Sequence, residues 1–242
     1  TTNHSKTFSA RTTIEPLTGL RIELNADKNF SENYSSFFRW VDTLGGAPYL
    51  DYASQNPMTT GMMSMSTIAW GTAFIRDLDN NVSPVFEQFR ENRETASDIL
   101  GSANPNSTGL GNNEAGYYDG YGSTQQDVII SSFLAAYTGK NIGSQHTNPF
   151  TMTPLPNWKI TFDPMAKTKI KFMKKRFKSF SISHGYRSTV NISNYSTNLL
   201  GSTDASGNIN STDITGNFIN PKLISMVSLS EQFSPLINVD IT

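Results

Sequence analysis

Cysteine is absent from the 242 residues, so the chain forms no disulfide, holds no thiolate nucleophile and has no cysteine-ligated zinc site. Charged residues are few, at 16% against about 25% in an average soluble domain. The formal net charge of −1 favours no particular charged partner. Serine, threonine, asparagine and glycine fill the gap, a composition typical of extracellular β proteins and outer-membrane barrels.

Long apolar runs are also missing. The chain contains neither the apolar core of a signal peptide nor a run of about 18 apolar residues, which excludes a transmembrane helix. A transmembrane β-barrel remains open, because its strands need only about 9–11 residues of alternating character. The chain begins TTNHSK and stops at INVDIT in mid-pattern, so we expect it to be a piece of something longer.

Catalytic and metal-binding patterns are lacking as well. His4, His146 and His184 are scattered, without the spacing of a zinc site, and G-x-S-x-G is absent. The segment DLDNN (77–81) begins like a calcium loop but lacks glycine at the sixth position and glutamate at the twelfth. We therefore expect a non-enzymatic protein without cofactor or metal. His184 lies on an apolar strand face, where a structural or interface role is expected.

Alternating polarity is the main signal that is present. Successive side chains of a strand point to opposite faces, and residues 20–30 separate cleanly in this way. One face carries Leu20, Ile22 and Leu24, and the other carries Arg21, Glu23, Asn25 and Asp27. Residues 5–15 and 62–75 are predicted to be strands too. A short turn at 16–19 and a polar loop at 31–60 are expected between these three strands.

A second alternating stretch begins at residue 180. Its apolar face carries Phe180, Ile182, Tyr186, Val190 and Ile192, and its polar face includes Arg187 and Asn191. A polar loop at 201–220 separates it from a strand at 222–233. A short turn at 234–236 then leads into Ile237, Val239 and Ile241, and no internal repeat of fixed period is recognised.

Two helices are expected between these β regions. Ser83 and Pro84 suit the start of a helix over 84–100, with Gly101 as its stop. For a second helix over 124–138, Ser123 and Gln126 suggest a capping box and Gly139 an end.

Loop lengths then suggest a topology. Transmembrane barrels alternate short periplasmic turns with long outer loops. Three regions follow: barrel strands with one long outer loop at 5–76, a periplasmic helical insertion at 77–178, and barrel strands at 179–242. This assignment requires PNWKITF (156–162) not to cross the membrane. Lipid is the predicted environment of the apolar face, and a β-sandwich core is the rival because it gives the same alternation.

One concentrated charge feature lies at 167–178, KTKIKFMKKRFK. Nucleic-acid binding is the generic interpretation of such a run. Here isoleucine, phenylalanine and methionine interrupt the charges, and the run adjoins the strand that begins at Phe180. Anchoring at a lipid interface suits this mixture better. The residues assigned to that interface are Lys171, Lys174, Lys175 and Arg176, and no nucleic-acid partner is expected.

Four stretches resemble one family closely: YYDGYGSTQQDVIISSFLAAYTGK (117–140), PLPNWKITFDPM (154–165), FKSFSISHGYRSTVNI (177–192) and SLSEQFSPLINVDIT (228–242). They are similar to the SprA/Sov outer-membrane translocons of the type IX secretion system of Bacteroidota, which is also tied to gliding motility. FSARTTIEPLTGLRIEL, near the N-terminus, fits the same region. Members of that family are several times longer than this chain, so the resemblance implies a fragment.

The resemblance implies an all-β transmembrane barrel in the cell outer membrane that exports folded cargo proteins. Its implied partners are the remainder of the same chain, a PorV-like outer-membrane barrel, a periplasmic plug protein, secreted cargo and membrane lipid. It implies no catalytic residues. Two alternatives remain open from the residues alone. One is a porin or TonB-type barrel for small solutes, and the other is a secreted β-sandwich adhesin.

Overall fold

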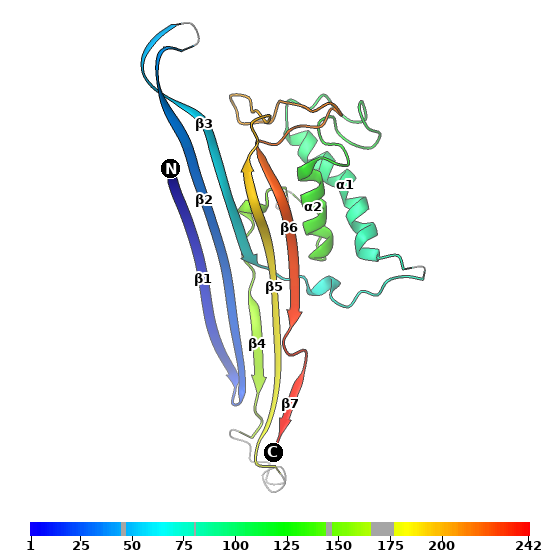
Figure 1. The fold of residues 1–242 in the computed structure, drawn as a ribbon. Helices are drawn as coiled ribbons and strands as arrows, with labels where there is room; N and C mark the ends of the chain where they lie inside the picture. The colour runs from blue at the N-terminus through cyan, green and yellow to red at the C-terminus, as the bar shows by residue number, and fades with distance from the viewer. Residues whose placement is uncertain (45–46, 80, 144–146, 166–176) are drawn as a thin grey trace.

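The computed structural model describes residues 1–44, 47–79, 81–143, 147–165 and 177–242 (Figure 1). In this part of the chain, seven strands form one antiparallel sheet and two α-helices stand beside it. The strands are β1 (Thr2–Leu17), β2 (Leu20–Leu44), β3 (Ala47–Ser66), β4 (Asn157–Phe162), β5 (Phe180–Thr197), β6 (Lys222–Phe233) and β7 (Asn238–Ile241). The helices are α1 (Pro84–Ala103) and α2 (Gln126–Tyr137).

The seven strands occupy five side-by-side positions in the sheet, because two of these positions are each shared by two strands. We call each position a track. β1 pairs with β2, and the track between β2 and β5 is shared by β3 and β4. β3 pairs with β2 from Lys28 onward, and β4 pairs with its first residues, Leu20 to Asn25. β6 and β7 likewise share the track on the far side of β5. Two of the five tracks are therefore interrupted strands.

The expected strands and turns are partly confirmed. The strands predicted at 5–15 and 20–30 are present, and the 16–19 turn lies between them. The loop predicted over 31–60 is wrong, because β2 continues to Leu44 and pairs with β3 as a long hairpin. The third strand ends at Ser66 rather than residue 75. The expected turn at 234–236 does not reverse the chain, because β6 and β7 run antiparallel to the same strand.

Strand parity required PNWKITF not to cross the membrane, but residues 157–162 of this stretch form β4, a strand within the sheet. Its residues pair with β2 on one side and β5 on the other, for example Ile160 with Ile22 and with His184. The helical segment therefore leaves the sheet after Ser66 and returns at Asn157, in the middle of one track. We call residues 67–156 the insertion. Its boundaries differ from the predicted 77–178 because β3 ends at Ser66 and β4 belongs to the sheet.

The helix ends follow the sequence signals only in part. Ser83 precedes α1 and Pro84 opens it, as predicted. Gly101 does not stop this helix, which continues to Ala103. For α2 the cap is Gln125 rather than Ser123, and the Gln125 Oε1 atom accepts hydrogen bonds from the backbone N–H groups of residues 127 and 128. Across the described part of the chain, neither helix has the length and apolar character needed to span a bilayer.

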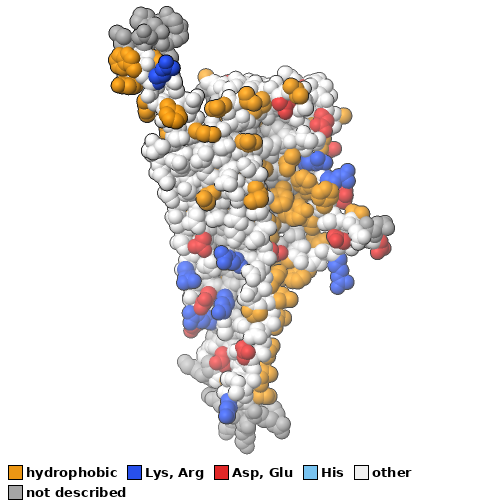
Figure 2. All heavy atoms as spheres, viewed as in Figure 1, with side chains coloured by type: hydrophobic (Ala, Val, Ile, Leu, Met, Phe, Trp, Pro, Cys, Tyr) orange, Lys and Arg blue, Asp and Glu red, His pale blue; other side chains and the backbone are white. Residues whose placement is uncertain are grey.

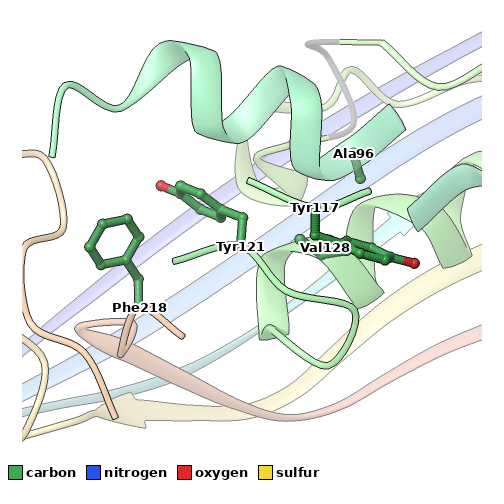
Figure 3. Packing of buried hydrophobic residues seen from close by; sticks show 5 residues of the cluster. All are labelled: Ala96, Tyr117, Tyr121, Val128 and Phe218. Carbon is green, nitrogen blue, oxygen red and sulfur yellow. The ribbon is translucent and has the colours of Figure 1, made fainter. Parts of the chain in front are cut away.

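The insertion shares its core with the segment that connects β5 to β6. Phe218 of that segment packs with Ala96, Tyr117, Tyr121 and Val128 (Figure 3). Hydrogen bonds add to this contact, and the Asn104 Nδ2 atom donates to the Ile209 carbonyl at 3.0 Å. The prediction placed 77–178 and the 201–220 loop on opposite sides of a membrane. That prediction is wrong, because the two segments form one packed unit.

Candidate functional site

The register of the sheet separates the predicted site residues onto two faces. Directly opposed residues of an antiparallel pair project from the same face. Ile14 opposes Ile22, Ile22 opposes Ile160, and Ile160 opposes His184. One face, which we call the apolar face, therefore holds all eight predicted apolar residues: Leu20, Ile22, Leu24, Phe180, Ile182, Tyr186, Val190 and Ile192. The other, the polar face, holds all six polar ones: Arg21, Glu23, Asn25, Asp27, Arg187 and Asn191.

The insertion covers the apolar face over the half of the sheet next to the β5–β6 connection. Val190 is 0% exposed and packs with Ile130 and Leu134 of α2. Ile192 is buried with Met63 and Tyr195, and Tyr186 is buried as well. The prediction that Tyr186, Val190 and Ile192 face lipid is therefore wrong, because the chain's own residues cover them. Alternation alone could not show which partner covers a strand face.

The other half of the apolar face is not covered by any described residue. Leu20, Ile22, Leu24, Phe180 and Ile182 are partly exposed there. Further apolar side chains on the same face are exposed, from β1 and from β7. They are Phe8, Ile14, Leu17, Val239 and Ile241. Together these ten residues form what we call the apolar band, which is larger than the scattered apolar residues of an ordinary soluble surface.

An aromatic cluster marks the boundary between the covered and uncovered halves. Trp158 of β4 stacks on Tyr186 of β5 with ring centroids 4.3 Å apart. Trp70, in the first turn of the insertion, stacks on Trp158 at 5.6 Å and meets Phe233 at 5.5 Å. Phe74 packs on Phe233 in turn. The insertion thus begins with aromatic rings laid on the sheet at the edge of the apolar band.

Polar contacts tie the covered half together beyond this cluster. The Lys28 ammonium donates to the carbonyl groups of Phe150 and Met152, both at 2.7 Å. Glu32 accepts from the Tyr195 hydroxyl at 2.9 Å and pairs with Lys222 at 3.3 Å. Burial alone would raise the pKa of Glu32, but the hydrogen bonds and charge of Tyr195 and Lys222 lower it below its ordinary value. The insertion thus supplies the partners of Lys28, and the neighbouring strands β5 and β6 supply those of Glu32.

On the strands that carry the apolar band, the polar face is solvent-exposed and charged. Arg21 and Glu23 form an ion pair at 2.9 Å, with both side chains substantially exposed. Asp27 accepts from Ser9 at 2.7 Å and from Asn25 at 3.1 Å. In Figure 2 the lower sheet turned toward the viewer shows charged side chains, whereas apolar ones line its right-hand margin and the region below the helices. The two faces therefore suit two different environments.

Two predicted features give less information. The residues assigned to a basic interface, Lys171, Lys174, Lys175 and Arg176, lie outside the described residues.

His184 projects from the apolar face, and its Nδ1 atom lies 2.5 Å from the Leu236 carbonyl. Its ring also meets Trp70 and Phe233. These contacts fit the structural role expected for this histidine.

Neither the strand β4 nor the aromatic cluster was predicted from the sequence. A signal was present, because Trp158, Ile160 and Phe162 alternate with Asn157, Lys159 and Thr161. This is the same period of two that identified residues 20–30. Strand parity required this stretch not to cross the membrane, although its own pattern indicates a strand.

The comparisons with known proteins add no relative to this geometry: no protein-family model matches the chain, and no curated protein matches it at a significant level.

Proposed function

We propose that this chain is part of the wall of a transmembrane β-barrel in the bacterial outer membrane. In this proposal the apolar band faces lipid and the polar face lines a water-filled lumen. The observation that carries it is the division of the apolar face: the insertion buries one half, and on the other half the ten residues of the apolar band, from β1, β2, β5 and β7, stay exposed or partly exposed. A soluble sheet would leave such a face exposed only at a cost in solubility.

The dimensions of the apolar band support this proposal. On β1 it extends from Phe8 to Leu17. This stretch contains ten residues, within the roughly 9–11 that a tilted transmembrane strand needs. Aromatic girdles commonly flank the lipid-facing band of such barrels, and Trp70 and Trp158 occupy that position here.

We propose the function of a protein-conducting channel on the basis of the resemblance to the SprA/Sov translocons. On that basis the full barrel is very large and non-enzymatic, and it exports folded cargo in type IX secretion and gliding motility. In the described part of the chain the outer edges of β1 and of the β6–β7 track pair with no further strand. We assign the missing neighbours to the remainder of the same chain. A PorV-like barrel and a periplasmic plug protein complete the proposed partners.

The sidedness in this proposal differs from the one expected from the sequence. The short 16–19 turn lies at the end of the sheet where Leu20 pairs with Phe162. The insertion packs against the β5–β6 connection, at the other end (Figure 1). We assign the 16–19 turn to the periplasm, because short turns are periplasmic in outer-membrane barrels; the insertion and the long β2–β3 hairpin then both extend at the cell surface.

The two rival functions differ in what they require. A β-sandwich adhesin needs a second sheet on the apolar face, and no described strand lies over the apolar band. The exposed band therefore favours lipid as its partner. A porin or TonB-type barrel shares every local feature described above and differs in strand number, which the length of the parent chain would reveal.

A paired substitution in the parent protein tests the proposal. Ile22→Arg places a charge in the apolar band, where an arginine near the bilayer midplane costs about 2–4 kcal/mol. Asn25→Arg places the same charge on the polar face, beside Asp27. We expect the first variant to lose most folded, protease-resistant protein from the outer membrane and the second to keep it.

A sandwich core would also reject Ile22→Arg, so the environment of the position must be measured separately. A nitroxide probe on Ile14→Cys, an exposed position of β1, should collide with membrane-dissolved oxygen more than with a water-soluble nickel complex. Equal loss from both arginine variants, or a preference for nickel at residue 14, would contradict the proposal.

A further inference from the structure

The segment that joins β3 to α1, together with the first turn of α1, carries a run of exposed apolar side chains. Trp70, Phe74, Ile75, Leu78, Val82 and Phe86 are all exposed, and Leu78 reaches 59%. We call these six residues the lateral arm. Figure 1 shows this segment extending sideways from the sheet, below both helices. Its tip is a tight turn in which the Leu78 N–H donates to the Val82 carbonyl at 2.8 Å.

The lateral arm lies at the end of the insertion that faces the apolar band. α1 starts from the arm at Pro84 and runs toward the β5–β6 connection, where Asn104 meets Ile209. That far end is built from asparagine, glycine, serine and threonine, as in the 104–113 segment NPNSTGLGNN. The insertion therefore exposes six apolar side chains at the end next to the band, whereas this segment at the other end exposes one, Leu110. A unit standing on a membrane surface needs this distribution.

The lateral arm is continuous with the apolar band through the aromatic cluster. Phe74 meets Phe233 with ring centroids 5.3 Å apart, and Trp70 stacks on Trp158. Lipid that reaches the upper edge of the band must then contact Trp70 and Phe74, and the remaining arm residues extend that contact away from the sheet.

We propose that the lateral arm is an interfacial anchor that lies in the outer leaflet beside the barrel and holds the insertion upright on the membrane surface. This inference rests on the proposed function, because it takes the apolar band as lipid-facing. Its occupant is lipid at the boundary between head groups and acyl chains, where tryptophan and phenylalanine are favoured.

Charge does not supply the attraction. Arg76 is offset by Asp77 and Asp79 within the arm, so electrostatic binding to anionic head groups is not expected. Burial of the six apolar side chains supplies it instead, because removing apolar surface from water is favourable. Binding of the arm should therefore depend weakly on salt.

Site-directed spin labelling in native outer membranes tests the anchor. The chain has no cysteine, so Leu78→Cys, Val239→Cys and Ile214→Cys each add one labelling site to a parent protein freed of other cysteines. Val239 reports on the apolar band, Leu78 on the arm, and the fully exposed Ile214 on the β5–β6 connection, which packs against the far end of the insertion. For each label the accessibility to oxygen is divided by the accessibility to a water-soluble nickel complex.

We expect this ratio to be several-fold higher at residues 239 and 78 than at residue 214. A high ratio at residue 239 with a low one at residue 78 would overturn the anchor and leave the proposed function standing. Low ratios at both positions would overturn the proposed function as well. A label at residue 78 shielded from both reagents would mean that protein, rather than lipid, covers the arm.

Discussion

Ser66 and Leu155, 89 residues apart in sequence, exchange two hydrogen bonds. The Ser66 hydroxyl donates to the Leu155 carbonyl at 2.7 Å, and the Leu155 N–H donates to the Ser66 carbonyl at 3.0 Å. The same hydroxyl accepts from the Asp27 N–H at 3.0 Å. Asp27 lies where β2 passes the gap between β3 and β4. One serine therefore closes the neck of the insertion and satisfies a backbone donor that the interrupted track leaves without a ladder partner.

Ser66→Ala should open this neck. The substitution removes two side-chain hydrogen bonds and leaves the Asp27 N–H and the Leu155 carbonyl unsatisfied, at about 1–3 kcal/mol for a buried group. Amide hydrogen exchange at Asp27 should accelerate while exchange in the middle of β5 stays slow. Ser64→Ala, two residues earlier on the same strand, is the control and should leave the exchange of Asp27 unchanged.

An interruption of this kind is invisible in a one-dimensional pattern. Alternation correctly predicted the faces of residues 20–30 and 180–192, because it depends only on neighbouring side chains. It could not reveal that β3 and β4 share one track, since that pairing joins residues separated by the whole insertion. Parity counting then failed, because it assumes that every strand crosses the sheet from end to end.

Substitution of Gly101 tests why α1 continues past the residue that was expected to stop it. Glycine is a poor residue inside a helix, so Gly101→Ala should gain about 1 kcal/mol from helix propensity alone. A methyl group at this position would, however, collide with the Cβ and Cγ atoms of Tyr118. Overpacking of a well-filled core costs about 1–3 kcal/mol, and we expect it to prevail. The unfolding temperature of the insertion, followed by circular dichroism, should fall.

The matched control is Ser102→Ala, at the neighbouring exposed position of α1. It should leave the unfolding temperature nearly unchanged or raise it slightly. A rise with Gly101→Ala as well would mean that Tyr118 can move aside. This tertiary contact explains why the sequence signal misled: glycine near a helix end usually marks a stop, and here it makes room for an aromatic ring.

Asp127 should make the stability of the insertion depend on pH. Burial raises the pKa of its carboxyl group to about 6 from an ordinary 3.8, although the Asn220 amide donates to it at 2.9 Å. A raised folded-state pKa means that the folded protein keeps its proton after the unfolded chain has lost it. The free energy of unfolding should therefore fall as the pH rises from about 4 to 6, and the dependence should end above pH 6.

The change amounts to about 2 kcal/mol once partial exposure of the side chain is considered. Asp127→Asn keeps an acceptor for Asn220 and removes the titration, so its unfolding curves at pH 4 and pH 6.5 should differ less than those of the wild type. A wild-type protein that becomes more stable across this interval would contradict the raised pKa.

Labelling of intact cells should decide on which side of the membrane the insertion lies. Ala115 is exposed in the segment between α1 and α2, and Thr18 is exposed in the short turn between β1 and β2. The packing of Phe218 into the insertion places Ala115 on the side of the β5–β6 connection, which the proposed topology assigns to the cell surface. A membrane-impermeant maleimide should therefore modify Ala115→Cys on whole cells. It should reach Thr18→Cys only after the outer membrane is permeabilised.

The reverse pattern would restore the periplasmic insertion that loop lengths alone had indicated, and it would require the long loop at 201–220 to be periplasmic as well. Modification of both variants on whole cells would mean that the sheet does not cross the membrane between these two residues.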